Sequence, residues 1–176
     1  MTVLDIVLEG DSRLRQKATK IRHADEGLRK LAADMHETMD EAPGVGLAGP
    51  QVGVMRRIIV VHVAGQDIGE GEPDVRLTML NPEIVRGAGT EVATEGCLSI
   101  PHWIGDVPRM TSITVKALDL NNRPMRIKAH GYLARVLQHE VDHLDGIMFI
   151  DRIEDKATLK EVFDDEEEYE AAEMVG

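Results

Sequence analysis

Two histidines four residues apart, His139 and His143, enclose a glutamate in the stretch QHEVDHLDG near the C-terminal end of the chain. If this stretch is helical, the two imidazoles lie one turn apart on the same face and can bind one metal ion. Glu140 would then lie about 100° round the helix from His139, close enough to reach a water molecule on that ion. The spacing predicts a metal site, although a chain with seven histidines can also place two on a plain polar helix face.

A third ligand is needed, because catalytic metal sites commonly use three protein ligands and leave one position for water. Cys97 is the only cysteine, and it follows Gly96 in the stretch TEGCLSIPHW. A single cysteine is more often a small buried apolar residue than a ligand. A thiolate would nevertheless complete the set, which makes Cys97 the candidate. The other histidines have no partner at ligand spacing and are interpreted as non-ligands: His23, His36, His62, His102 and His130.

Helical periodicity predicts two helices that must position these residues. Residues 25–41 repeat apolar side chains at helical spacing, and Asp25 can cap the first turn. A second helix, from about 131 to 144, carries His139 and His143. Its apolar stripe, which should face the core, consists of Leu133, Val136, Leu137, Val141 and Leu144.

Stretches typical of β-strands lie between the helices. Residues 57–63 are rich in β-branched side chains, and shorter strand candidates occur around 77–80 and 90–93. The clearest hairpin spans 113–129, where two central asparagines can adopt the left-handed angles of a tight turn. These elements predict a single α+β domain, with mixed or antiparallel strands around the C-terminal HExxH helix and an amphipathic helix near the N-terminus.

The composition predicts a globular protein of the cytoplasm that neither spans a membrane nor binds nucleic acid directly. Apolar residues make up 43% of the chain, yet no segment approaches the roughly 20 apolar residues of a membrane helix. The N-terminal segment has neither the apolar core of a secretion signal nor the basic, acid-free character of a transit peptide. One cysteine allows no intramolecular disulfide, and the net charge of −12 comes with no basic stripe.

The acidic charge is concentrated at the C-terminal end. Residues 161–176 contain eight acidic residues and no basic residue, so the other 160 residues share the remaining −4. We therefore expect an acidic helix or tail at this end of the chain, over 154–176. Because binding to RNA requires cationic side chains that displace counterions, this tail should repel RNA.

Three stretches resemble the three motifs of the peptide deformylase family, in the same order and at similar spacing. They are GVGLAGPQ at 44–51, EGCLSIP at 95–101 and QHEVDHLDG at 138–146. The resemblance covers about residues 1–153 and implies that this range is the catalytic domain. HExxH alone also occurs in unrelated metalloproteases, whereas the three ordered motifs together are specific.

The resemblance implies an activity and a set of metal ligands. The protein would remove the formyl group from the N-terminal formyl-methionine of newly made polypeptides, by attack of a metal-bound hydroxide. Cys97, His139 and His143 would be the ligands, and Glu140 the general acid and base. The family suggests Fe2+ as the native ion, although Zn2+, Ni2+ and Co2+ accept the same ligands. The nascent chains would bring the enzyme transiently near the ribosome, but not through the acidic tail.

The resemblance also implies how the peptide is bound. Gln51 and the backbone N–H of Leu98 would stabilise the oxyanion, and Val45 and Gly46 would contact the peptide. In one departure, Gly49 stands where the family usually has a second alanine, and the missing methyl group should loosen the loop that holds Gln51 slightly.

Further expectations concern the residues around the ligands. Glu95 is the candidate to accept the second N–H of a ligating histidine. Asp142 could pair with Arg109, or both could form an ordinary surface pair. The aliphatic stem of Arg135 could border the substrate pocket.

Two rival functions use the same motif. A metalloprotease is disfavoured by the Cys97 candidate ligand and by the lack of a third histidine or glutamate beyond the helix. A metal-stabilised binding module would need a fourth protein ligand to close the site, and the chain has no second cysteine to provide it.

Overall fold

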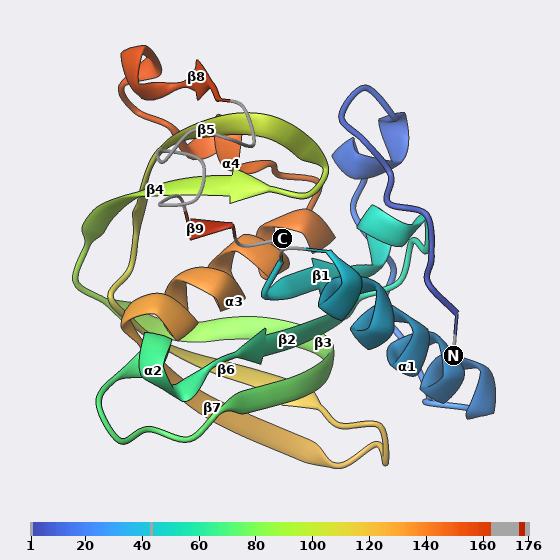
Figure 1. The fold of residues 1–176 in the computed structure, drawn as a ribbon. Coiled ribbons are helices and arrows are strands. Elements are labelled where there is room, and N and C mark those ends of the chain that lie inside the picture. Colours follow the sequence, from blue (N-terminus) through green and yellow to red (C-terminus); the bar gives the residue numbers. More distant parts are fainter. Residues whose placement is uncertain (1, 43, 163–172, 175–176) are drawn as a thin grey trace.

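The computed structural model describes residues 2–42, 44–162 and 173–174, which form two β-sheets with a long helix between them (Figure 1). The larger sheet has five strands in the order β1-β2-β3-β6-β7, and all neighbours are antiparallel. These strands are β1 (Gly46–Ala48), β2 (Ile58–Val63), β3 (Val75–Ala88), β6 (Ser112–Leu118) and β7 (Pro124–His130). The predicted α+β class is confirmed.

The smaller sheet has the strand order β8-β5-β4-β9. Its strands are β8 (Lys160–Glu161), β5 (Ile100–Arg109), β4 (Glu91–Cys97) and β9 (Glu173–Met174). The antiparallel pair β4 and β5 forms its centre, and β9 lies parallel to β4, opposite Glu95 and Gly96. Strand β4 therefore leads directly to Cys97 at its last position.

Helix α3 (Gly131–Leu144) is the long helix between the two sheets, and its bounds agree with the predicted 131–144 (Figure 1). Every residue from Leu133 to Leu144 is buried, because strands cover the helix from both sides. The predicted apolar stripe therefore belongs to the core. The polar residues of α3 are buried as well, which places His139, Glu140 and His143 in the interior.

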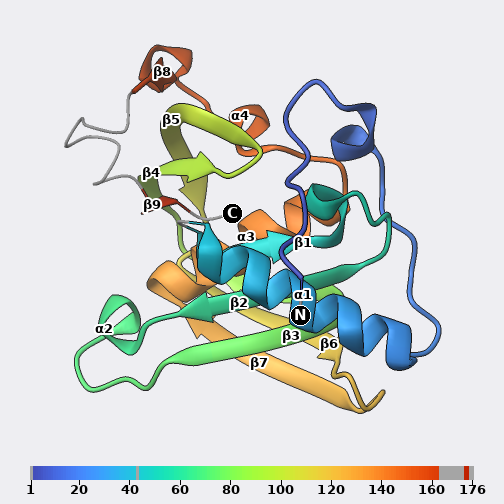
Figure 2. The same ribbon diagram turned by 45° about the vertical axis from the view of Figure 1, so that its right-hand side comes forward.

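Helix α1 (Glu26–Glu41) packs beside β1 and β2 (Figure 2). It begins as predicted, because the Asp25 side chain accepts a hydrogen bond of 2.8 Å from the backbone N–H of Leu28. The predicted hairpin of β6 and β7 also forms, with Asn122 at φ 62° in its turn. The short helices are η1 (Ser12–Arg15), η2 (Gly49–Val52), α2 (Gly65–Ile68), α4 (Phe149–Arg152) and η3 (Lys156–Thr158).

The acidic C-terminal region is described only in part. Residues 163–172 and 175–176 lie outside the described residues, so the expected helix or tail over 154–176 stays a prediction there. The described part contributes η3 and the short strands β8 and β9. None of the helices in the described ranges has the length and apolar character needed to cross a membrane.

Candidate metal centre

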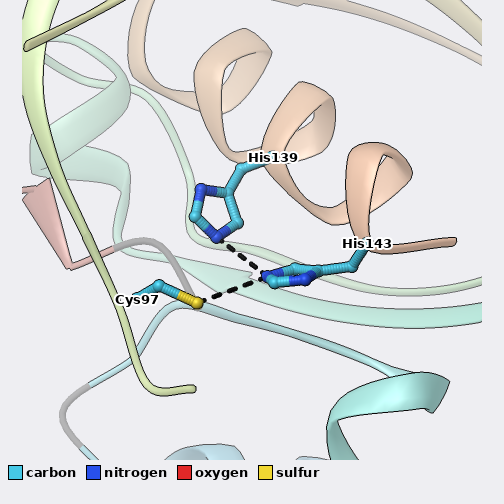
Figure 3. A group of neighbouring side chains, drawn as sticks. All are labelled: Cys97, His139 and His143. Carbon is cyan, nitrogen blue, oxygen red and sulfur yellow. Dashed lines mark hydrogen bonds between the residues drawn. The ribbon is translucent and has the colours of Figure 1, made fainter. Parts of the chain in front are cut away.

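Three ligand atoms converge where the end of β4 meets α3 (Figure 3). The Nε2 atom of His143 lies 3.1 Å from Nε2 of His139 and 3.4 Å from Sγ of Cys97. All three ligand atoms lie within 4.8 Å of one another, and all three residues are buried. The structure thus brings together the cysteine and the two histidines that the sequence separates by more than 40 residues.

The two separations measured from Nε2 of His143 suit ligands of one divalent ion, and Sγ of Cys97 and Nε2 of His139 lie within 4.8 Å of each other. Bonds of about 2.0–2.3 Å to nitrogen and sulfur in a tetrahedral site place neighbouring ligand atoms roughly 3.3–3.7 Å apart. The observed 3.1 and 3.4 Å lie close to that range. His139 bonds through Nδ1 to Glu95, so its ring proton is on Nδ1 and its Nε2 lone pair faces the centre. Within the described ranges, no other group of histidine, cysteine and acidic residues is arranged to hold an ion.

The surroundings of Cys97 suit a thiolate ligand. Burial raises the pKa of the Cys97 thiol well above its usual value, while hydrogen bonds from the backbone N–H groups of Ser99 and Ile100 lower it in part. Coordination to a divalent ion deprotonates a thiol outright, which overrides the effect of burial. The two N–H groups are then positioned to stabilise the bound thiolate.

Glu140 is a buried carboxyl group without a hydrogen-bond partner among the described residues. Burial raises its pKa well above the usual value. Burying a carboxyl group without a hydrogen-bond partner destabilises the fold. Such a group is retained when its partner is a molecule that the site binds, such as water or substrate. The carboxyl group packs on Gly46, where a Cβ atom would lie 2.4 Å from Oε1. Gly46, expected to contact the peptide, thus also makes room for Glu140.

The side-chain amide of Gln51 is fixed beside the ligands. Gln51 lies in η2 and is fully buried, and its Oε1 accepts a 2.8 Å hydrogen bond from the backbone N–H of Ala48. This orients Nε2 towards Sγ of Cys97 at 3.7 Å and Oγ of Ser99 at 3.3 Å. The predicted oxyanion donor is therefore next to the predicted metal ligands. Ser99 lies within the EGCLSIP stretch, but nothing in the sequence singled it out.

Leu98 and Val45 lie in the two segments that adjoin the site, next to Cys97 and Gly46 respectively. Leu98 directly follows Cys97, and its side chain packs against Gly44, where a Cβ atom would be 2.7 Å from Cδ1 of Leu98. The backbone carbonyl of Val45 accepts a 2.8 Å hydrogen bond from His62. Strand β1, which follows Val45, lies at the edge of the five-stranded sheet.

The expectation that Gly49 loosens the loop is wrong. A Cβ atom at Gly49 would lie 2.6 Å from the carbonyl oxygen of Arg56 and 2.7 Å from that of Val54. The backbone of Val54 also donates a 2.9 Å hydrogen bond to the Gly49 carbonyl. The loop is closed tightly on itself at this point, and glycine permits that approach.

The N-terminal segment reinforces both loops that carry the site. The backbone N–H of Val7 donates to the carbonyl of Gln51 at 2.7 Å, and that of Glu9 donates to the carbonyl of Ser99 at 2.8 Å. Both loops are therefore held by one short segment near the N-terminus, residues 7–9.

The expected contact of Glu95 with a candidate ligand histidine is confirmed, because its Oε2 lies 3.0 Å from Nδ1 of His139. Burial alone would raise the pKa of Glu95, but hydrogen bonds from His139 and Arg109, with the charge of Arg109, bring it well below the usual value. The expected pair of Asp142 with Arg109 also forms, at 2.6 Å and out of solvent. The expectation for Arg135 is wrong: its side chain is buried and bonds to Glu95 instead of bordering a pocket.

Comparison with known proteins identifies relatives that span nearly the whole chain. Residues 3–158 match the family described as "Polypeptide deformylase". A peptide deformylase of Thermomicrobium roseum is 58% identical over 168 residues, which is 96% of both chains. The crystal structure of the Ehrlichia chaffeensis peptide deformylase in complex with actinonin is 39% identical, with a TM-score of 0.83, and the match covers 90% of this chain and 92% of that one. The Thermotoga maritima peptide deformylase is 40% identical with a TM-score of 0.78, covering 87% and 99%.

Proposed function

The chain belongs to the polypeptide deformylase family, and we propose that Cys97, His139 and His143 hold its catalytic metal ion. It is a hydrolase that removes the formyl group from the N-terminal formyl-methionine of newly made polypeptides. The observation that supports these ligands best is their convergence beside Glu140, a buried carboxyl group with no described partner. A site built only for stability would not keep such a group.

Glu140 is the general acid and base of this proposal. A bound divalent ion would supply Lewis acidity, lowering the pKa of water to about 7 so that hydroxide is available at neutral pH. Glu140 takes a proton from the attacking water and delivers it to the amine as the formamide C–N bond breaks. The products are formate and a peptide with a free N-terminal methionine. Gly46 leaves the Glu140 carboxyl group space to approach this bond.

The oxyanion formed during attack is stabilised by Gln51 and the backbone N–H of Leu98. Gln51 fits this role because its oxygen is held by Ala48, which directs Nε2 to the ligand side of the site. One such donor contributes about 3 kcal/mol to transition-state stabilisation.

The peptide binds in extended form along β1, with backbone contacts to Val45 and Gly46. Strand β1 supports this placement because it lies at the edge of its sheet and its first residue, Gly46, packs against Glu140. An extended ligand can add to such an edge through backbone hydrogen bonds. The methionine side chain enters an apolar pocket shaped by residues 44–47 and α3.

The native ion in this proposal is Fe2+, while Zn2+, Ni2+ and Co2+ suit the same donor set. A ferrous centre with a thiolate ligand inactivates in air through oxidation of the metal and of Cys97. The Fe2+ form should therefore lose activity in air while the Ni2+ form keeps it. Equal air stability of the Fe2+, Ni2+ and Zn2+ forms would argue for zinc instead.

The cellular setting completes the proposal. We place the enzyme in the cytoplasm, where formyl-methionyl nascent chains emerge, with transient proximity to the ribosome that does not involve the acidic tail. The catalytic domain of this proposal is 1–153, and we expect neither a membrane contact nor direct binding to nucleic acid.

Release of formate from a formyl-Met peptide, measured without oxygen, tests the function. The Glu140→Gln variant is the matched control, since it keeps the side-chain shape but cannot take a proton. We expect it to retain the metal and to lose activity by roughly 10²–10⁴-fold. Near-normal turnover of this variant with metal bound would exclude Glu140 as the base. Cleavage of internal bonds in an unformylated peptide would instead favour the metalloprotease.

A further inference from the structure

We propose that Arg135 is a positioning residue for the metal ligand His139 and acts through Glu95. Arg135 lies one turn before His139 on α3, and both side chains reach the same carboxylate. Nη1 of Arg135 donates to Oε1 of Glu95 at 2.8 Å, while Nδ1 of His139 lies 3.0 Å from Oε2. The inference rests on the proposed ligand set.

The Glu95 carboxylate is held on all sides. Arg109 forms a two-point contact with it, from Nε to Oε1 at 2.9 Å and from Nη2 to Oε2 at 3.0 Å. With the bonds from Arg135 and His139, each oxygen has two partners, which fills the four acceptor positions of a carboxylate. Because Glu95 is 0% exposed, no water replaces a missing donor. Its orientation, and with it the plane of the His139 ring, depends on both arginines.

Charge balance gives Arg135 a role that Arg109 cannot fill alone. Arg109 also donates to Asp142 at 2.6 Å, so its charge is shared between two buried carboxylates. Arg152 contributes to Asp142 but is not bonded to Glu95. Arg135 is thus the second cation on Glu95. Without it, the carboxylate would draw more strongly on the Nδ1 proton of His139 and change the electron density on Nε2.

Arg135 also ties the helix to the strand that carries the third ligand. Its guanidinium donates to the backbone carbonyls of Glu91 in β4 at 3.0 Å and of Val107 in β5 at 2.9 Å. Strand β4 ends at Cys97, and α3 carries both histidines. One buried guanidinium therefore sets the distance between the two elements that supply the ligands. Its fork of donors serves three acceptors in different directions, which a lysine ammonium cannot match.

The test uses the Co2+-loaded protein, whose visible spectrum reports ligand geometry. Arg135→Met and Arg135→Lys are compared with wild type for the spectrum, the rate of Co2+ loss to a chelator and the unfolding temperature. Arg57→Met is the matched control, since Arg57 is also buried and bonds to the end of α3 at Leu144 and Asp145, away from Glu95.

We expect Arg135→Met to shift the Co2+ bands and to lose Co2+ about 10-fold faster. This is the lower end of the roughly 10–100-fold loss in metal affinity that follows removal of a direct partner of a ligand, because Arg135 acts through Glu95. Arg135→Lys should fall between this variant and wild type. Arg57→Met should lower the unfolding temperature with an unchanged spectrum.

An unchanged spectrum and an unchanged rate of Co2+ loss in Arg135→Met would reduce Arg135 to a structural role. If that variant does not fold, the same result in Arg135→Lys overturns the proposal. Failure of the ligand set is distinguishable, because the wild-type protein itself would then not bind Co2+ with a thiolate signature.

Discussion

Gly46 lies directly against the carboxyl group of Glu140, so that a Cβ atom at position 46 would be 2.4 Å from Oε1 and 2.7 Å from the carboxyl carbon. Real Cβ atoms essentially never approach another atom that closely, and both residues are buried. The position of the proposed base therefore depends on a residue of another element, β1, that has no side chain.

The Gly46→Ala variant tests this dependence. The added methyl group must displace the Glu140 side chain, so formate release should fall at least tenfold while the metal content stays near that of wild type. Atomic absorption and the formate assay measure the two quantities on one sample. Wild-type turnover in this variant would show that Glu140 does not need its present position.

Gly49 gives a second glycine prediction, this one on stability. An alanine there meets two backbone carbonyls, of Arg56 and Val54, which cannot move as a side chain would. We expect Gly49→Ala to lower the free energy of unfolding by about 1–3 kcal/mol, as overpacking does. The control is Gly69→Ala, whose Cβ atom would have its nearest contact at 3.4 Å, with the flexible Glu72 side chain. Equal stability of the two variants in urea would contradict the contact argument.

The thiolate of Cys97 is tested by metal selectivity. Cys97→Ser replaces a soft ligand with a hard hydroxyl group, so the site should bind Zn2+ or Fe2+ more weakly or change its preferred ion. Competition with a chelator measures the affinity of each ion. The Glu140→Gln variant serves as the reference that alters the site but spares the ligands. Full metal content together with unchanged activity in Cys97→Ser would remove Cys97 from the ligand set.

His36 makes stability depend on pH outside the metal centre. Burial, followed by the positive charge of Arg76, lowers the pKa of His36 from 6.5 to about 4. Between pH 4 and 6.5 the unfolded chain therefore binds a proton at this position that the folded protein does not. His36 therefore lowers the free energy of unfolding as the pH falls from 6.5 to 4.

The matched variant is His36→Gln, which can keep the hydrogen bond that Nε2 of His36 shares with Thr78 at 3.0 Å. Its free energy of unfolding should fall less than that of wild type between pH 7 and pH 5. Denaturant titrations at both pH values measure the difference. Parallel pH profiles would mean that His36 does not titrate between them.

Periodic elements were predictable from sequence, and contacts between elements were not. Helix α3 agrees with its predicted bounds because its apolar stripe repeats at helical spacing. Strand β5 was missed, since IPHWIGDVPR contains two prolines that usually exclude a central strand. Proline lacks the backbone N–H that a strand donates to its neighbour. Both prolines are tolerated because β8 pairs with β5 only at Trp103 and Ile104, so neither proline has to donate to β8.

In the candidate site too, local motifs were predictable from sequence and contacts between elements were not. Its ligands stand in short motifs, so their types and local spacing indicate a metal. The burial of Arg135 depends on how the β4–β5 hairpin docks on α3, which leaves no local pattern. The sequence-based expectation therefore put Arg135 at the rim of a pocket. Its actual partner, Glu95, lies 40 residues away in sequence. The close approach around Gly49 is likewise a contact between loop segments.

The acidic C-terminal region gives the last prediction, on partners. A chain that ends at Val162 keeps the packing of that residue, which is 0% exposed and bonds to the carbonyl of His102 at 2.8 Å. It loses β9, which pairs with Glu95 and Gly96 on the edge of β4 beside Cys97. Because β9 contributes no proposed ligand, formate release from free formyl-Met peptides should not fall.

The same truncation removes most of the negative charge that opposes contact with RNA phosphates. Association with ribosomes should therefore not weaken, and it should strengthen at low salt, where the repulsion acts over a longer distance. Co-sedimentation of both proteins with ribosomes at two salt concentrations measures this. If the truncated chain loses an association that the full chain shows, the region after Val162 is a docking element, and its interaction with the ribosome is not governed by charge.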